Sequence, residues 1–197
     1  MKNIYVPYIP GLEALTFEEL DKKMELHASK DFIGEVNWKE YSHKPSVSFR
    51  IARSERCLVI IYDVRGMDLR AVNFEDNGPV WEDSCCEFFI SHPSDGTYYN
   101  FELNCIGTLL GAKRRSRTDA DMFPPEKLSK IVRHATLERK AYEQSGEIHC
   151  WSAAVCIPFE FIDMDPEALP ESIRANFYKG GDLTAHPHYL SWNRIGT

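Results

Sequence analysis

Hydrophobic and polar residues alternate along several short segments of this chain. In residues 46–51, three apolar side chains alternate with polar ones, and the same alternation recurs in residues 97–105 and 173–179. Successive side chains of a β-strand point to opposite faces, so this period of two predicts strands with one buried face.

Other segments are apolar without interruption. Residues 57–64 form such a run, which predicts a central strand covered on both faces. Residues 65–79 are polar and contain turn residues, so we predict a long loop there. Further strands are expected at residues 4–9, 84–91, 107–112, 132–140, 148–157 and 189–195.

A helix is expected near the N-terminus. The sequence Thr16-Phe17-Glu18-Glu19 is a capping-box pattern, in which the threonine and the second glutamate each bond the backbone of the other. The helix should run to about His27 and pack across an open edge or end of the sheet.

Roughly nine or ten strands with hairpin-like spacing predict an all-β fold. We expect an antiparallel β-sandwich of the immunoglobulin or jelly-roll kind, with one short N-terminal helix. A chain of 197 residues fits one domain. Within that domain, residues 1–45 are predicted to form a strand and helix that pack on a module spanning residues 46–197.

The charge of the chain excludes some partners. Its formal net charge is −7 at pH 7, so it repels phosphate backbones, and we expect no nucleic-acid partner. The basic run at residues 113–117 precedes Asp119 and Asp121, which indicates a solvated loop.

We also expect no membrane span and no signal peptide. The predicted location is cytoplasmic, or periplasmic or secreted if a leader was removed.

Sequence motifs for catalysis or metal binding are weak. The six cysteines form no Cys-x-x-Cys pair and mostly lie in apolar stretches, which favours reduced thiols. His186-Pro187-His188 could hold a metal, but such a pair is more often merely polar. Standard hydrolase and nucleotide-binding motifs do not occur.

An ordered set of segments resembles the family 9 carbohydrate-binding modules. These segments are Pro79 to Ile90, Tyr98 to Thr108, Ile157 to Phe159, Arg174 to Tyr178 and Leu190 to Asn193. The resemblance covers the chain from about residue 46 to its end. It implies a β-sandwich that binds a mono- or oligosaccharide between two tryptophans, and this favours binding over catalysis.

The resemblance also implies which residues bind the sugar. Trp81 and Trp192 match the two stacking tryptophans, Glu87 matches an acidic residue that bonds hydroxyls, and Asn176 and Arg174 lie on the expected face. An indole packs well on the apolar face of a pyranose, and carboxylates or amides bond its hydroxyls. An extended run would separate residues 81 and 87 by ~20 Å, so Trp81 must lie on a bend.

The residues leave two other functions open. Glu87 and Glu102 lie on the polar faces of neighbouring expected strands, and paired carboxylates are the requirement for glycoside hydrolysis. The second alternative keeps the fold as a protein-interaction scaffold that has lost sugar binding.

The family resemblance further implies structural calcium as the one candidate cofactor. Asp76, Asp83 and Asp95 are the candidate ligands, since calcium requires several converging oxygens.

Overall fold

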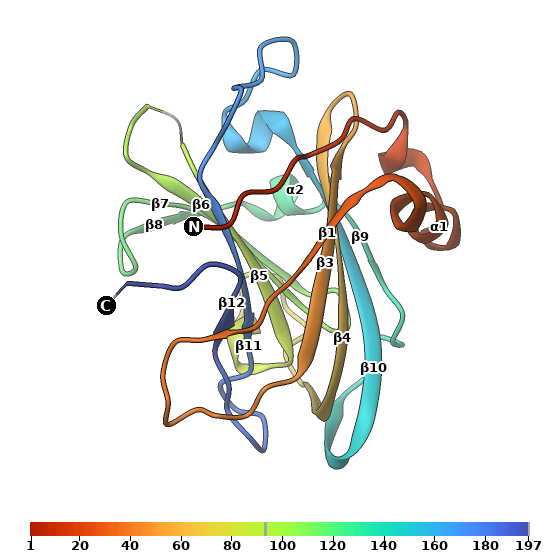
Figure 1. Cartoon of the computed structure of the whole chain (residues 1–197), viewed down its shortest axis with the longest axis vertical. Helices are drawn as coiled ribbons and strands as arrows, with labels where there is room; N and C mark the ends of the chain where they lie inside the picture. The colour runs from red at the N-terminus through yellow and green to blue at the C-terminus, as the bar shows by residue number, and fades with distance from the viewer. Residues whose placement is uncertain (93, 197) are drawn as a thin grey trace.

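The computed structural model describes residues 1–92 and 94–196 as two antiparallel sheets packed face to face (Figure 1). Sheet A has the strand order β1 (Ser29–Phe32), β3 (Ser46–Arg53), β4 (Cys57–Ala71), β10 (Tyr142–Pro158) and β9 (Val132–Ala135). Sheet B has the order β2 (Glu35–Val36), β12 (Leu190–Ser191), β11 (Ala175–Gly180), β5 (Cys85–Ser91), β6 (Tyr98–Asn104), β7 (Leu109–Arg114) and β8 (Ala120–Met122). This arrangement confirms the predicted β-sandwich.

Few helical segments accompany the sheets. The two α-helices are α1 (Phe17–His27) and α2 (Pro125–Leu128), and the 3-10 turns are η1 (Leu12–Ala14), η2 (Val80–Glu82) and η3 (Phe159–Ile162). The capping box is present as predicted, because the Thr16 side chain accepts from Glu19 N and the Glu19 side chain accepts from Thr16 N. Within the described residues, neither α-helix has the length and apolar character needed to cross a membrane.

The main core lies between the two sheets and is rich in aromatic rings. Phe177 of β11 stacks on Phe49 of β3 with ring centroids 3.7 Å apart, and Phe88 lies 4.9 Å from Phe177. All three side chains are buried. The strand alternation seen in the sequence therefore places the apolar side chains of both sheets in one shared layer.

Helix α1 packs on the outer face of sheet A, rather than on an edge or end of the sheet as expected. Leu20 and Met24 are fully buried against Val59 and Ile61 of β4. The odd residues of this strand segment thus face the helix, while the even ones face the main core. Coverage on both faces explains the continuous apolar run of β4.

A buried arginine fixes the helix on the sheet. Arg50 of β3 is 3% exposed. Its guanidinium lies 2.7 Å from Asp21 of α1 and 3.0 Å from Asp63 of β4. Burial tends to lower the pKa of Arg50, but these two carboxylates outweigh burial and raise it. The three charges hold α1 in one position along the strands.

The predicted loop at residues 65–79 is partly wrong. Strand β4 continues to Ala71, since residues 68–71 pair with residues 142–145 of β10. Leu69 and Ala71 are buried in the main core, so this segment keeps a strand pattern despite its polar residues. A register shift between Ser145 and His149 marks an irregularity in the long ladder.

The N-terminal segment contributes to both sheets. Its strand β1 pairs with β3 at one edge of sheet A, and β2 pairs with β12 at one edge of sheet B. The expected strand at residues 4–9 is reduced to an isolated bridge between Tyr8 and Arg53. All six cysteines are free thiols, and Cys150 is the exposed one among them.

Candidate functional site

Two glutamates occupy the centre of the outer face of sheet B, the face turned away from the core. Glu87 of β5 and Glu102 of β6 are directly opposite each other across the strand pair. Tyr178 of β11 flanks Glu87, and Leu110 of β7 flanks Glu102, so four strands present one row of side chains. Neighbouring side chains in such a row lie close enough to act together.

The two carboxyl groups are close, buried and incompletely bonded. One carboxylate oxygen of Glu87, one of Glu102 and the sulfur of Cys85 all lie within 4.8 Å of one another. Glu87 is 8% exposed and Glu102 is 6% exposed. Glu102 Oε2 and the amide Nδ2 of Asn100, also on β6, are buried and have no hydrogen-bond partner among the described residues. Buried polar atoms are normally paired, so these two atoms are exceptions that mark the centre of this face.

Burial controls the ionisation of the glutamate pair. Desolvation raises the pKa of Glu102 to about 7. Burial also raises the pKa of Glu87 well above its usual value, with further increases from the negative charges of Glu102 and Asp182. Two carboxylates this close repel each other, so the pair retains a proton near neutral pH. The site can therefore both donate and accept hydrogen bonds.

Arg114 supplies positive charge at the end of β7. Its Nη2 lies 3.9 Å from Glu102 Oε1, and its Nε donates to Asn100 Oδ1 at 3.0 Å. Arg115 instead points to Asp119 and Asp121, forming ion pairs of 2.8 and 2.7 Å. The basic run is thus divided between the end of a strand and a loop of exposed ion pairs.

Trp81 lies on the bend that a shared site with Glu87 requires. It belongs to the 3-10 turn η2, which precedes β5, and its side chain is 40% exposed. The loop after β11 is bonded to this turn, because Asp182 N donates to Trp81 O at 3.3 Å and Leu183 N donates to Glu82 O at 3.1 Å. Val80 of the same turn packs with Cys85 and with Leu110, the residue that flanks Glu102, so the turn lies against this face of the sheet.

Trp192 does not offer a stacking surface, which corrects the expectation from the sequence. Its ring is 4% exposed and packs edge-on against Phe49 and Phe177, with centroids 5.6 and 5.7 Å away. Its Nε1 donates to Asp31 Oδ2 at 2.7 Å. The residue faces the core because it follows the inward-pointing Leu190 by two positions.

Asn176 belongs to β11 and Arg174 directly precedes it, on the side of Tyr178 that leads away from the loop at residue 181. The Asn176 side chain accepts from Asn193 N and Phe177 N and donates to Asn193 O, so it fixes the C-terminal segment. Arg174 is exposed and precedes β11. It lies four residues from Tyr178, or ~13 Å along the strand. Asn176 is paired with Phe89 and is thus the diagonal neighbour of Glu87 on the same face, whereas Arg174 lies one further step along the strand direction.

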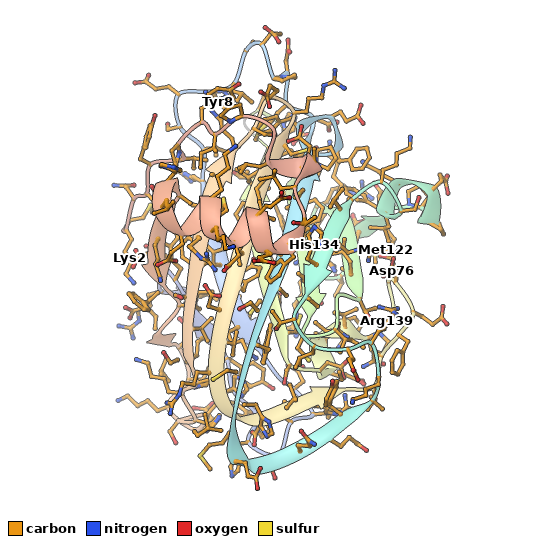
Figure 2. The ribbon with its side chains drawn as sticks, turned by 90° about the vertical axis from the view of Figure 1, so that its right-hand side faces the viewer. Lys2, Tyr8, Asp76, Met122, His134 and Arg139 are labelled. Atoms are coloured by element: carbon orange, nitrogen blue, oxygen red, sulfur yellow. The ribbon has the colours of Figure 1, made fainter. Side chains whose placement is uncertain are left out.

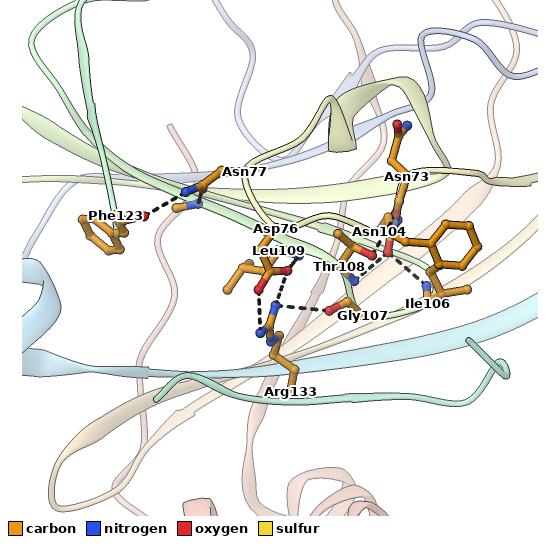
Figure 3. Close-up of polar contacts among 12 residues, drawn as sticks. Asn73, Asp76, Asn77, Asn104, Ile106, Gly107, Thr108, Leu109, Phe123 and Arg133 are labelled. Atoms are coloured by element: carbon orange, nitrogen blue, oxygen red, sulfur yellow. Dashed lines mark hydrogen bonds and ion pairs between the residues drawn. The ribbon is translucent and has the colours of Figure 1, made fainter. Parts of the chain in front are cut away.

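A cavity of about 480 Å³ lies elsewhere, beside β9. It is lined by residues of the 74–76 loop, Ile106, Gly107, residues 133–135 and Arg139. Figure 2 shows Asp76, His134 and Arg139 on this side of the molecule. Figure 3 shows the Asp76 carboxylate bound by both terminal nitrogens of Arg133, at 2.7 and 2.9 Å. The Asp76 and Arg133 side chains of this cavity are thus bonded to each other, whereas the buried His134 Nε2 has no partner among the described residues.

The three aspartates proposed for calcium do not fit a calcium site. Asp76 is bound by Arg133, and Asp83 accepts from Arg70, two backbone N–H groups and the Asn104 amide. Asp95 accepts from Thr97 and faces Lys113. Calcium needs several oxygens aimed at one point, whereas these oxygens face separate donors and cations.

Two groups of side chains have the spacing for another metal. One consists of Cys85, Glu87 and Glu102, and the other of His43, Asp68 and His188. Burial raises the pKa of the Cys85 thiol well above its usual value, so it stays protonated and is a poor ligand. The histidine group does not share this defect.

Several residues of the outer face were missed in the sequence. Asn100, Arg114, Tyr178 and Asp182 lie close to the glutamates, although none is within three positions of Glu87 in the chain. The alternation of residues 97–105 already placed Asn100 beside Glu102 on one face. Strand pairing and the conformation of the 181–189 loop were needed for the others.

Comparison with known proteins gives the context for this geometry. The model of carbohydrate-binding family 9 matches residues 18–197. A candidate carbohydrate-binding protein from Bacteroides uniformis has 33% sequence identity and a TM-score of 0.88, with 98% of this chain and 89% of that chain covered. No curated protein matches the chain.

Two structures of a family 9 carbohydrate-binding module from Caldicellulosiruptor kristjanssonii share the fold. The complex with glucose has a TM-score of 0.57 at 10% identity and covers 96% of this chain and 85% of that one. The complex with cellotriose has a TM-score of 0.56 at 8% identity and covers 95% and 83%. Since the family model matches most of the sequence, the chain belongs to carbohydrate-binding family 9.

Proposed function

We propose that this protein binds carbohydrate on the outer face of sheet B. The carrying observation is the Glu87–Glu102 pair, in which buried polar atoms remain without partners, while Trp81 is exposed on the turn that precedes β5. The family membership supports this class of ligand, and its relatives from Caldicellulosiruptor kristjanssonii are complexes with glucose and cellotriose.

Each residue of the proposed site has a distinct role. Trp81 provides the apolar platform for the C–H face of a sugar ring. Glu87 and Glu102 bond adjacent hydroxyls, and the shared proton lets one of them act as a donor. Arg114 orients Asn100 and lowers the electrostatic cost of a second negative charge. Binding between two tryptophans is not part of the proposal, because Trp192 is buried.

Calorimetric titration of a sugar panel that includes glucose and cellotriose tests the proposal. Trp81→Ala should weaken binding by roughly 5- to 150-fold, since loss of one aromatic platform removes about 1–3 kcal/mol. Phe74→Ala is the matched control, because Phe74 is 37% exposed and lines the other cavity. Loss of binding in the Phe74 variant alone would move the site to that cavity, and no binding to any sugar would favour the interaction scaffold.

The rival function, glycoside hydrolysis, gains support from the spacing of the two carboxyls. Their oxygens lie within 4.8 Å, and retaining glycosidases hold such groups about 5 Å apart. Retaining enzymes, however, need the carboxyls on two sides of the scissile bond. Here both side chains rise from neighbouring strands of one sheet and face the same side of any bound sugar. Release of nitrophenol from aryl glycosides, abolished by Glu87→Gln, would overturn the binding-only role.

A further inference from the structure

A cluster of histidines lies at the end of the sandwich where three segments meet. His43 comes from the loop between β2 and β3, Asp68 from the second half of β4, and His188 from the loop before β12. Figure 1 shows these two loops, orange and blue, at the same lower end of the molecule. One potential ligand atom from each of the three residues lies within 4.8 Å of the other two. The segments are far apart in the sequence, so only the fold assembles this group.

The Asp68 carboxylate has hydrogen-bond partners, whereas the His43 nitrogen that faces it has none among the described residues. The Asp68 side chain is 1% exposed and accepts from His186 N at 2.8 Å and contacts His186 Nδ1 at 3.0 Å. His43 Nε2 lies 4.0 Å from Asp68 Oδ2, too far for a hydrogen bond. That nitrogen is buried and has no partner in the described part of the chain. An unpaired buried nitrogen is costly unless something else bonds it.

The position of the hydrogen on the His188 ring leaves the other ring nitrogen with the lone pair that a metal requires. Its Nδ1 lies 2.9 Å from the carbonyl oxygen of His186. A carbonyl only accepts, so Nδ1 carries the hydrogen and Nε2 keeps a lone pair. Metal-binding histidines are usually held in this way, with the second nitrogen donating to a carbonyl or carboxylate.

We propose that His43, Asp68 and His188 bind a divalent transition-metal ion, for which Zn²⁺ is the best match. Two imidazoles and one carboxylate form a ligand set typical of zinc sites that keep one position open. Bonds of about 2.0–2.1 Å place tetrahedral ligands roughly 3.3 Å apart, so the side chains must close by about an ångström. Two of the three ligands lie on loops, where side-chain rotation allows this closure.

Lys179 is the group that competes with the ion. Its Nζ lies 3.0 Å from His188 Nε2 and also bonds the carbonyl oxygen of Gly180. When the ion takes the His188 lone pair, Lys179 retains the Gly180 carbonyl. The buried Lys179 amine thus keeps one hydrogen-bond acceptor.

The bound ion would stiffen the loop that carries His188. Residues 182 and 183 of that loop donate to the backbone of Trp81 and Glu82. The ion would therefore join sheet A, through Asp68, to the turn that carries Trp81. This role concerns the position of the loop and does not depend on which molecule Trp81 contacts.

Zinc titration of the chelator-treated full chain tests the site, with a chromophoric chelator as competitor. We expect one ion per chain at micromolar or tighter affinity, and at least tenfold weaker binding in His43→Ala. His43 makes no hydrogen bond in the described residues and is partly exposed, so this variant should fold. His27→Ala is the matched control, since His27 is exposed on α1, and Cys150→Ser removes the exposed thiol. Both should bind like the unmodified chain.

Cobalt substitution gives a second measurement that does not depend on variant folding. Co²⁺ bound to nitrogen and oxygen ligands shows visible d–d bands without a strong thiolate charge-transfer band in the near ultraviolet. A charge-transfer band would identify a cysteine site and overturn the proposal. Unchanged zinc affinity in His43→Ala, or no binding at micromolar concentration, would overturn it as well.

Discussion

Glu102→Gln separates the stability of the protein from its proposed binding. Glutamine keeps the size and polarity of the side chain but cannot ionise. Burial raises the pKa of Glu102 from 4.5 to about 7, so the folded state favours the neutral form. A raised pKa in the folded state stabilises the protein below pH 4.5, and this contribution is lost as pH rises through about 7.

The magnitude follows from the size of this shift. Each pH unit between the two values corresponds to about 1.4 kcal/mol, so ionising Glu102 costs about 3 kcal/mol of unfolding free energy. Glu102→Gln should exceed the stability of the original protein by about 1 kcal/mol at pH 5 and by about 3 kcal/mol at pH 8. Binding should change in the opposite direction, because hydrogen bonds to a charged acceptor contribute about 1.5–3 kcal/mol. We expect sugar affinity to fall by roughly 10- to 100-fold.

Urea denaturation at pH 5, 6, 7 and 8 measures the difference between the variant and the original chain. Glu167→Gln, at an exposed position, serves as the control and should give a flat difference over this range. A difference for Glu102→Gln that does not change with pH would refute the assignment of a raised pKa. Stability that rises as predicted, with undiminished sugar binding, would refute the role of Glu102 in the site.

Three further substitutions test separate parts of the structure. Gly180→Ala places a Cβ 3.3 Å from Glu87 Oε1, so calorimetry should show up to about tenfold weaker sugar binding, with stability changed by no more than about 1 kcal/mol. Trp192→Phe loses the bond to Asp31 and leaves a small void, which should cost about 1–3 kcal/mol in urea denaturation and leave sugar affinity unchanged. Arg50→Ala leaves two carboxylates without their cation beneath α1, and should cost about 2–4 kcal/mol by the same assay. Loss of sugar affinity in Trp192→Phe would contradict the argument for Trp192. Full sugar affinity together with a marked loss of stability would contradict the one for Gly180→Ala, and unchanged stability would contradict the one for Arg50→Ala.

The sequence predicted the fold well because alternation directly reports which side of a strand is buried. It failed at β4, where residues 65–71 are polar enough to resemble a loop but pair with β10. Strand pairing between segments roughly seventy residues apart is a tertiary property and leaves no local pattern. The position of α1 was missed for a similar reason, since an amphipathic stripe does not specify which apolar surface it covers.

The candidate site was predicted unevenly. Strand alternation placed Glu87 and Glu102 on polar faces. The bend at Trp81 followed from the length of an extended strand, which would hold residues 81 and 87 too far apart to share a site. Burial of Trp192 could not be predicted, because an indole suits a core and a binding surface equally well. The sequence did not indicate His43 or Asp68, since their proximity to His188 depends on two loops and the far end of a long strand.

Strand order in sheet B has a consequence for how the chain folds during synthesis. Strand β5 pairs with β11, and roughly ninety residues separate the partners in the chain. At about 5–20 residues per second, one edge of β5 remains unpaired for roughly 5–20 seconds after it leaves the ribosome. Until β11 and β12 arrive, apolar side chains such as Phe88 have no complete core, and an open strand edge can pair with other chains. Folding of this sandwich should therefore be completed only after β11 and β12 have been synthesised, and truncation before residue 175 should give chains that aggregate.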